Sequence, residues 1–332
     1  MRMAESTIPG RSCPLSYRYG AAALRRPADF SAQTLYVIGG LYGNQFALDA
    51  LLALQHVEPD AELVFNGDFN WFNRDDAAFS AINTEVLRHR ALRGNVETEL
   101  LSQDAAAGCG CGYPDYVDDA DVARSNAMMG LLSQTAQRHR ALGERLAALP
   151  MNLVAQVGGL RIGIVHGDAD SLAGWRFGEE AIEPDRLAAW FSTAQVRVFA
   201  SSHTCLPVGE TYATGIGPCA LFNNGAAGMP NFASTAYGLI TRISTRPAPA
   251  ALRALYGTVI NAVHLDCVPL YYDQKAWLAH FDRVWPADSP AALSYRRRIV
   301  NGPNYTQADA MRGMVAASGG ATRKPLVAAE AA

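Results

Sequence analysis

The sequence has few cysteines and no long apolar run. Six cysteines are scattered over 332 residues, and only Cys109 and Cys111 lie close together. Secreted proteins that depend on disulfide bonds have much denser cysteine patterns, so this pattern excludes a disulfide framework and favours reduced thiols. The sequence contains no stretch of about 18 apolar residues, the length needed to cross a membrane. Residues 1–20 also lack the apolar segment of a signal peptide. We therefore expect a cytoplasmic protein without a membrane partner.

The chain also lacks an excess of positive charge. Its 28 Lys and Arg residues face 31 Asp and Glu residues, which gives a formal net charge of -3. Broad binding to nucleic acid requires a basic electrostatic field, so nucleic acid is not expected as a bulk partner. With 49% hydrophobic residues, the chain can bury a sizeable core, and a small polar ligand is the expected partner.

The first regular unit follows a strand-helix-strand pattern. Residues 35–40 and 62–68 read as strands, and residues 44–56 place apolar side chains on one side of a helix. In such a βαβ unit, ligand-binding residues lie at the carboxyl ends of the strands. Further β-rich runs end in Gly, His, Asn or Asp, as is typical where strands meet turns. These runs are residues 160–168, 196–204, 219–226 and 237–244.

The remaining segments predict additions to an α/β core. Residues 1–31 have no period and read as a loosely attached N-terminal arm, while residues 77–92 read as a helix. Residues 102–120 are rich in Gly, Asp and Cys, and residues 122–149 predict one or two helices. We interpret residues 100–150 as a helical insertion into one domain at residues 32–246.

A C-terminal extension at residues 247–316 is expected to pack on this core. It contains a predicted strand near 259–267, an aromatic segment at 271–286 and a helix near 289–299. The Ala-rich residues 317–332 read as a disordered tail.

Four polar clusters stand at strand ends, and together they resemble the calcineurin-like metallophosphoesterase family. The family pattern is Asp-x-His, then Gly-Asp, then Gly-Asn-His-Asp/Glu, then a single His, then Gly-His-x-His. The resemblance extends from about residue 33 to 245 and implies a four-layer α/β/β/α sandwich. The matching clusters are Gly67-Asp68, Gly94-Asn95-Val96-Glu97, His166-Gly167-Asp168 and Ser202-His203-Thr204-Cys205.

The resemblance implies a metal site that is also the catalytic site. Asp68 would supply a carboxylate, Asn95 an amide oxygen, and His166 and His203 two imidazoles. Such a ligand set suits a divalent or trivalent transition metal, namely Mn, Fe or Zn. Taken one at a time, Asp68 and Asn95 could also be turn residues, and the two histidines could be hydrogen-bonded residues at the core edge.

A second metal site of the family is altered in this chain. Three of its four positions align with Gly40, Tyr42 and Cys205, and the fourth is the bridging Asp68. Gly40 has no ligating side chain, whereas Tyr42 as phenolate and Cys205 as thiolate can ligate iron or zinc. The alternatives are a packed aromatic ring for Tyr42 and a small buried apolar residue for Cys205.

The family's imidazole acid is also replaced, because Val96 occupies its position. Losing a positioned acid costs about 10²–10⁴ in rate unless another group substitutes. The ionisable residues near the motifs in sequence are Glu97, Asp168 and His264.

These features predict a divergent metal-dependent phosphoesterase that hydrolyses a small phosphorylated substrate with metal-activated water. The alternative is a mononuclear, iron-dependent enzyme of other chemistry, or a non-catalytic metal-binding or interaction protein that uses residues 271–286 as a partner surface. The Cys109–Cys111 segment reads as a lid-like loop or as a redox or zinc site. The turn at residues 39–43 lacks the G-x-G-x-x-G spacing, which disfavours dinucleotide binding.

Overall fold

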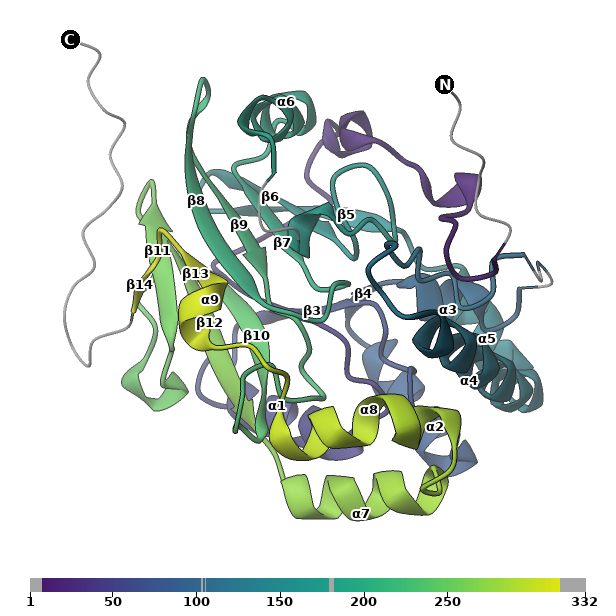
Figure 1. Cartoon of the computed structure of the whole chain (residues 1–332). Helices are drawn as coiled ribbons and strands as arrows, with labels where there is room; N and C mark the ends of the chain where they lie inside the picture. The colour runs from purple at the N-terminus through teal and green to yellow at the C-terminus, as the bar shows by residue number, and fades with distance from the viewer. Residues whose placement is uncertain (1–7, 103, 105, 179–181, 317–332) are drawn as a thin grey trace, which may run out of the picture.

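Two seven-stranded mixed sheets pack face to face, with helices on the outer face of each (Figure 1). The computed structural model describes residues 8–102, 104, 106–178 and 182–316. Apolar side chains of both sheets meet in the middle, among them Val37 and Leu239 of one sheet and Ile162 and Val198 of the other. This architecture confirms the α/β/β/α sandwich predicted from the motifs.

The first sheet has the strand order β1-β5-β6-β7-β9-β8-β13, and β6, β7 and β9 run parallel in its centre. The second sheet has the order β14-β11-β12-β10-β2-β3-β4, in which β2, β3 and β4 run parallel. The strands of the first sheet are Phe30–Ala32, Asn152–Val157, Leu160–Val165, Val198–Ser201, Gly217–Asn223, Val208–Thr214 and Met311–Arg312 in that spatial order. Those of the second are Val315–Ala316, Tyr256–Ile260, Val263–Tyr271, Tyr237–Ser244, Thr34–Ile38, Glu62–Asn66 and Arg90–Leu92.

The sequence of β2 explains why both of its faces are covered. Leu35 and Val37 point into the core between the sheets, whereas Tyr36 and Ile38 pack with the helices outside. Successive side chains of a strand point to opposite faces, so a continuous apolar run is typical of a strand buried on both sides. The same alternation places the residues after β2 and β3 at one edge of the sandwich.

Helices of two groups cover the two sheets. Leu187, Trp190 and Phe191 of α6 pack on Phe199 and Leu221 of the first sheet. The second sheet is covered by α1, α2, α7 and α8, while α4 and α5 form the helical insertion (Figure 1). The helices are α1 Gln45–Gln55, α2 Asp76–Val86, α3 Asn95–Glu99, α4 Asp119–Arg138, α5 Arg140–Ala147, α6 Pro184–Ala194, α7 Gln274–Val284, α8 Pro290–Asn301 and α9 Gln307–Ala310.

Two secondary-structure predictions were wrong. The helix expected over 77–92 ends at Val86, and residues 90–92 form the edge strand β4, paired in parallel with β3. Backbone pairing with β3 and burial of Leu92 outweigh the local helical pattern. The single strand expected near 259–267 is a hairpin, β11 and β12, whose turn residues Asn261 and Ala262 have φ of 46° and 64°.

The two ends of the described chain belong to the sandwich. Residues 8–31 are not a loosely attached arm, because Tyr17 and Leu24 are buried and the Tyr17 hydroxyl donates to Glu99 at 2.5 Å. At the other end, β11 and β12 continue the second sheet, and α7 and α8 pack on its outer face. The predicted tail at 317–332 lies outside the described residues.

The aromatic segment 271–286 packs against the sandwich. It forms α7, and Trp277, Phe281 and Trp285 are each about 1% exposed. This burial favours the packing interpretation of the segment over a partner surface. Within the described ranges, no helix combines the length and apolar character needed to cross a membrane.

A charged cluster lies on the outer face of the second sheet. Arg242 of β10 donates to both carboxylate oxygens of Glu58 at 2.6 Å and to Asp266 at 3.0 Å. Its side chain is fully buried. Burial by itself would raise the pKa of Glu58, but the hydrogen bonds from Arg242 and Tyr36 lower it overall. Glu58 is therefore ionised and paired with Arg242 at neutral pH.

Replacing Arg242 should destabilise the fold strongly. Arg242→Met removes the arginine partner of the buried Asp266 and of the partly buried Glu58, and removing one member of a buried ion pair costs about 3–5 kcal/mol. The control is Arg283→Met, which breaks the exposed pair with Asp75 and should cost less than about 1 kcal/mol. Urea unfolding measures both.

The same cluster should make the free energy of unfolding decrease at acidic pH. Since the pKa of Glu58 is lowered in the fold, its contribution is present above the unfolded pKa of about 4.3 and is lost as the pH falls through the lowered value. Equal urea midpoints for Arg242→Met and Arg283→Met would contradict the stabilising role assigned to the Arg242 ion pairs.

Candidate metal centre

The four predicted ligands follow four strands that end at the same edge of the sandwich. Asp68 and Asn95 come after β3 and β4 of the second sheet. His166 and His203 come after β6 and β7 of the first. Each sheet therefore contributes two adjacent, parallel strands, and the structure brings all four side chains together.

The four side chains converge on the Nε2 atom of His166. This atom lies 3.2 Å from Asn95 Oδ1, 3.3 Å from Asp68 Oδ1 and 3.1 Å from His203 Nδ1. One ligand atom from each of Asp68, His166 and His203 lies within 4.8 Å of the others. All four residues are buried.

Hydrogen bonds on the far side of each ring and amide fix which atom faces the centre. His166 Nδ1 lies 2.8 Å from the carbonyl oxygen of Asn66, and His203 Nε2 lies 3.0 Å from that of Cys111. A carbonyl oxygen only accepts, so these nitrogens donate, and His166 Nε2 and His203 Nδ1 face the centre in position to ligate a metal. Asn95 donates its Nδ2 to Cys109 and turns its oxygen inward.

The electrostatics of the cluster favour one positive charge at its centre. Burial lowers the pKa of His166, but the adjacent Asp68 carboxylate raises it overall. Burial conversely raises the pKa of Asp68, but His166 outweighs it and lowers that pKa. Burial and the charge of His166 lower the pKa of His203 to about 3, so this ring is neutral. A carboxylate, an amide oxygen and two imidazoles that together attract a cation fit Mn, Fe or Zn.

The backbone around Asp68 adopts an uncommon conformation to place its carboxylate. Gly67 and Asp68 have φ of 75° and 54°, in the left-handed region that side chains other than Asn and Asp rarely adopt. A Cβ at Gly94 would lie 2.2 Å from Asp68 Oδ1, so only glycine leaves room there. Val96 then donates its backbone N–H to the same oxygen at 3.2 Å.

Glu97 connects the turns that carry Asp68 and Asn95. Its carboxylate accepts from the backbone N–H groups of Asp68 at 2.7 Å and Gly94 at 3.0 Å, and from the Asn70 side chain at 3.1 Å. Burial and the charge of Asp68 raise the pKa of Glu97 to about 7. Glu97 is thus a positioning residue beneath the metal centre, a role that its place in the Gly-Asn-Val-Glu motif alone does not reveal.

The altered second site contains a neutral pair. The Tyr42 hydroxyl and the Cys205 thiol lie 2.8 Å apart, and burial raises the pKa of both groups. The Tyr42 ring fills the space next to Gly40, because a Cβ there would meet the ring at 2.5 Å. Among the residues that the structure describes, Cys205 does not join the Asp68, His166 and His203 cluster. Tyr42 is therefore a packed ring, and the phenol and thiol satisfy each other.

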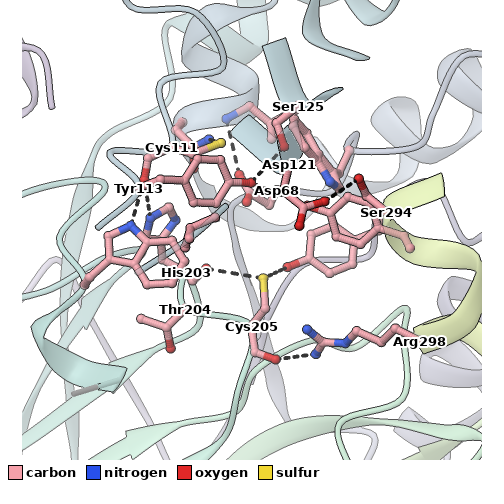
Figure 2. Close-up of a pocket in the computed structure, with 17 residues that line it drawn as sticks. Asp68, Cys111, Tyr113, Asp121, Ser125, His203, Thr204, Cys205, Ser294 and Arg298 are labelled. Carbon is pink, nitrogen blue, oxygen red and sulfur yellow. Dashed lines mark hydrogen bonds between the residues drawn. The ribbon is translucent and has the colours of Figure 1, made fainter. Parts of the chain in front are cut away.

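A pocket of about 250 Å³ opens above the metal centre (Figure 2). Asp68, Asn95 and His203 form its floor, and Trp71, Tyr113, Trp175 and Tyr295 line its walls. Arg298 of α8 lies at its side and donates to the carbonyl oxygens of Cys205 and Pro230. No sequence motif pointed to these wall residues, because they come from loops and helices outside the strand-end motifs.

The described pocket lining does not include the three ionisable residues near the motifs, which are Glu97, Asp168 and His264. Asp168 caps its own turn by accepting from the backbone of Asp170 and Ser171. His264 lies in β12 opposite Ser244, and Glu97 lies below the floor. None of these three residues therefore substitutes, in the pocket lining, for the imidazole that Val96 replaces.

Comparisons with known proteins identify the fold. No model of a known family and no curated protein matches the sequence. Among solved structures, a hypothetical protein from Pyrococcus horikoshii OT3 is 15% identical, with a TM-score of 0.53 over 82% of this chain and 99% of that one. A metallophosphoesterase from Sphaerobacter thermophilus is 15% identical, with a TM-score of 0.52 over 81% and 100%. The chain therefore has the metallophosphoesterase fold.

Glu97→Gln should weaken metal binding without removing a ligand. The amide can still accept from Asp68 and Gly94, but its NH₂ group then faces the NH₂ group of Asn70, which two further asparagines hold in place. Loss of such an outer partner lowers metal affinity about 10–100-fold. Titration calorimetry with Mn²⁺ measures the change.

The control is Glu99→Gln, a neighbouring buried carboxylate that is bonded to Tyr17 instead of to the metal turns. It should change stability but leave Mn²⁺ affinity within about threefold, since outer-partner effects act through the ligands themselves. Equal losses of affinity in the two variants would show that Glu97 acts through general stability.

Proposed function

We propose that this protein hydrolyses a phosphate ester with one transition metal held by Asp68, Asn95, His166 and His203. The observation that carries the proposal is the convergence of these four acceptor atoms at the floor of a pocket. When bound, such a metal supplies Lewis-acid polarisation of a phosphoryl oxygen and activation of a water molecule. The fold shared with a metallophosphoesterase adds support at the level of the architecture.

The chain contributes the orientation and the electrostatics of the site. The hydrogen bonds from His166 Nδ1 and His203 Nε2 to carbonyl oxygens aim the other nitrogen of each ring at one point. Arg298 is the one arginine or lysine among the described residues of the pocket lining. Carbonyl oxygens hold its guanidinium without neutralising it, so its charge is available to a phosphate oxygen. We assign Arg298 the binding of the phosphoryl group.

The neutral Tyr42–Cys205 pair supports a mononuclear centre. Gly40 offers no ligating side chain at the second site, and the Tyr42 hydroxyl and the Cys205 thiol lie 2.8 Å apart and hydrogen-bond to each other. The same observation favours a second candidate function, a mononuclear iron enzyme of other chemistry. Metal analysis separates the candidates: about one equivalent of metal with hydrolysis of 4-nitrophenyl phosphate supports the phosphoesterase. One equivalent of iron without hydrolysis of any phosphate ester would overturn it.

His203→Ala should remove most of the bound metal and the hydrolytic activity. The ring supplies one of four ligands, so the loss of affinity should be at least the roughly 10–100-fold seen for outer partners. The control is His56→Ala, an exposed histidine at the end of α1. Elemental analysis of both purified variants checks the prediction, and unchanged metal content in His203→Ala would contradict it.

Arg298→Met should lower kcat/KM for a phosphate ester while metal content stays the same. A hydrogen bond to a charged group contributes about 1.5–3 kcal/mol, so we expect a loss of roughly 10–150-fold. Arg297→Met, one position along α8 and exposed, is the matched control and should retain activity. If Arg298→Met lost metal as well, the residue would have a structural role and not a phosphate-binding one.

A further inference from the structure

The walls of the pocket are built from two aromatic pairs. Trp71 and Tyr295 meet edge to face with ring centroids 6.2 Å apart, and Tyr113 and Trp175 are tilted at 5.6 Å. The Tyr113 and Tyr295 hydroxyls lie 3.5 Å apart, which joins the two pairs at one side. The four rings come from four separate segments of the chain and meet only here.

The aromatic lining begins at the metal centre itself. The Trp175 ring lies edge to face with the ring of His203, with centroids 5.2 Å apart. The organic part of a phosphate ester placed at the centre would therefore lie beside these rings, which line the same pocket. The volume of about 250 Å³ lies below the usual range of about 300–1,000 Å³ for drug-sized ligands, so this organic part must be small.

Polar groups gather where the aromatic walls end. Tyr113 contacts Ser125 at 3.0 Å, and Ser294 donates to Asp121 at 2.8 Å. Asp121 also pairs with Arg124 at 2.5 Å, so it presents no unpaired charge that would select a cationic ligand. This arrangement accommodates a flat apolar ring that ends in a neutral polar group.

The lining also bears on how the organic part departs. The one histidine among the described lining residues is the ligand His203. Burial raises the pKa of Tyr113 and Tyr295, which makes both hydroxyls weak proton donors. A phenol has a pKa of about 10 and leaves as an anion more readily than an alkoxide, so an aryl ester depends less on a positioned acid.

We infer that the substrate is a small aryl phosphate monoester whose aromatic ring binds between the Trp71–Tyr295 and Tyr113–Trp175 pairs. This inference rests on the proposed phosphoesterase function. The oxygen of water forms the new bond to phosphorus and the water releases one proton to solvent, while the bond between phosphorus and the aryl oxygen breaks. The aryl oxygen leaves with the electron pair and takes a proton from solvent. The products are a phenol and inorganic phosphate.

A binding experiment tests the ring site without requiring turnover. Phenylphosphonate and methylphosphonate, which have the same anionic head, are titrated into the metal-loaded protein while tryptophan fluorescence is recorded. Stacking on aromatic side chains favours a planar ring. We expect phenylphosphonate to bind at least about tenfold more tightly. Equal affinity for the two phosphonates would overturn the inference.

Paired variants then locate the ring site. Tyr295→Leu removes one aromatic wall and should reduce the preference for phenylphosphonate at least about fivefold, whereas Tyr295→Phe keeps the ring and should keep the preference. Both variants are first compared with the parent by circular dichroism and metal content. If Tyr295→Leu does not fold, Trp71→Leu and Trp71→Phe make the same comparison on the opposite member of that pair. A preference unchanged in a folded leucine variant would contradict the assigned position.

Hydrolysis distinguishes failure of the inference from failure of the proposed function. Phenyl phosphate and glycerol phosphate are compared by release of inorganic phosphate with the metal-loaded protein. A kcat/KM for phenyl phosphate at least tenfold higher than that for glycerol phosphate supports both the aryl preference and the phosphoesterase function. Equal hydrolysis of both esters overturns the aryl preference and leaves the phosphoesterase function in place. Tight phenylphosphonate binding without hydrolysis of either ester overturns the phosphoesterase function, although the ring site stands.

Discussion

The hydrogen bond from His166 Nδ1 to the carbonyl oxygen of Asn66 is the contact on which the metal centre depends. It crosses from the first sheet to the second at the point where β6 and β3 end. The Asn66 side chain returns the link by donating to the carbonyl oxygen of Val165 at 2.9 Å. The relative position of the sheets and the orientation of the imidazole are therefore set by the same residue. A sandwich with the sheets shifted by one residue would lose both.

The strand-end motifs predicted which four side chains converge, because their signal is local. Each of Asp68, Asn95, His166 and His203 follows an apolar strand, and parallel strands of one sheet end at one edge. The pocket walls were not predictable in this way, since Trp71 and Tyr295 meet only through packing of α8. Backbone acceptors carry no residue-type signal at all, which is why the role of the Cys111 carbonyl was missed. The helix expected over 77–92 failed for the related reason that strand pairing is a nonlocal interaction.

The altered second site changes the charge balance around the phosphate position. Asp68 is the one carboxylate of the described ligand cluster, so a divalent metal there leaves a net positive centre. The Tyr42–Cys205 pair adds no charge beside it, and Arg298 adds one positive charge from α8. Positive charge is thus supplied from two directions, one of them from outside the strand-end motifs. Such an arrangement suits a dianionic monoester better than a neutral ligand.

The loop at residues 108–112 connects residues 8–31, which are distant in sequence from the strand-end motifs, to the metal centre. Its Cys109 and Cys111 carbonyls orient Asn95 and His203, while Gly110 is pressed against Tyr17 and Gly10 donates to Ala107. The loop carbonyls that hold Asn95 and His203 therefore also connect the insertion to residues 8–31. An ion that bound only this docked arrangement would stabilise all three segments together. Loading with metal would then be coupled to completion of the whole fold.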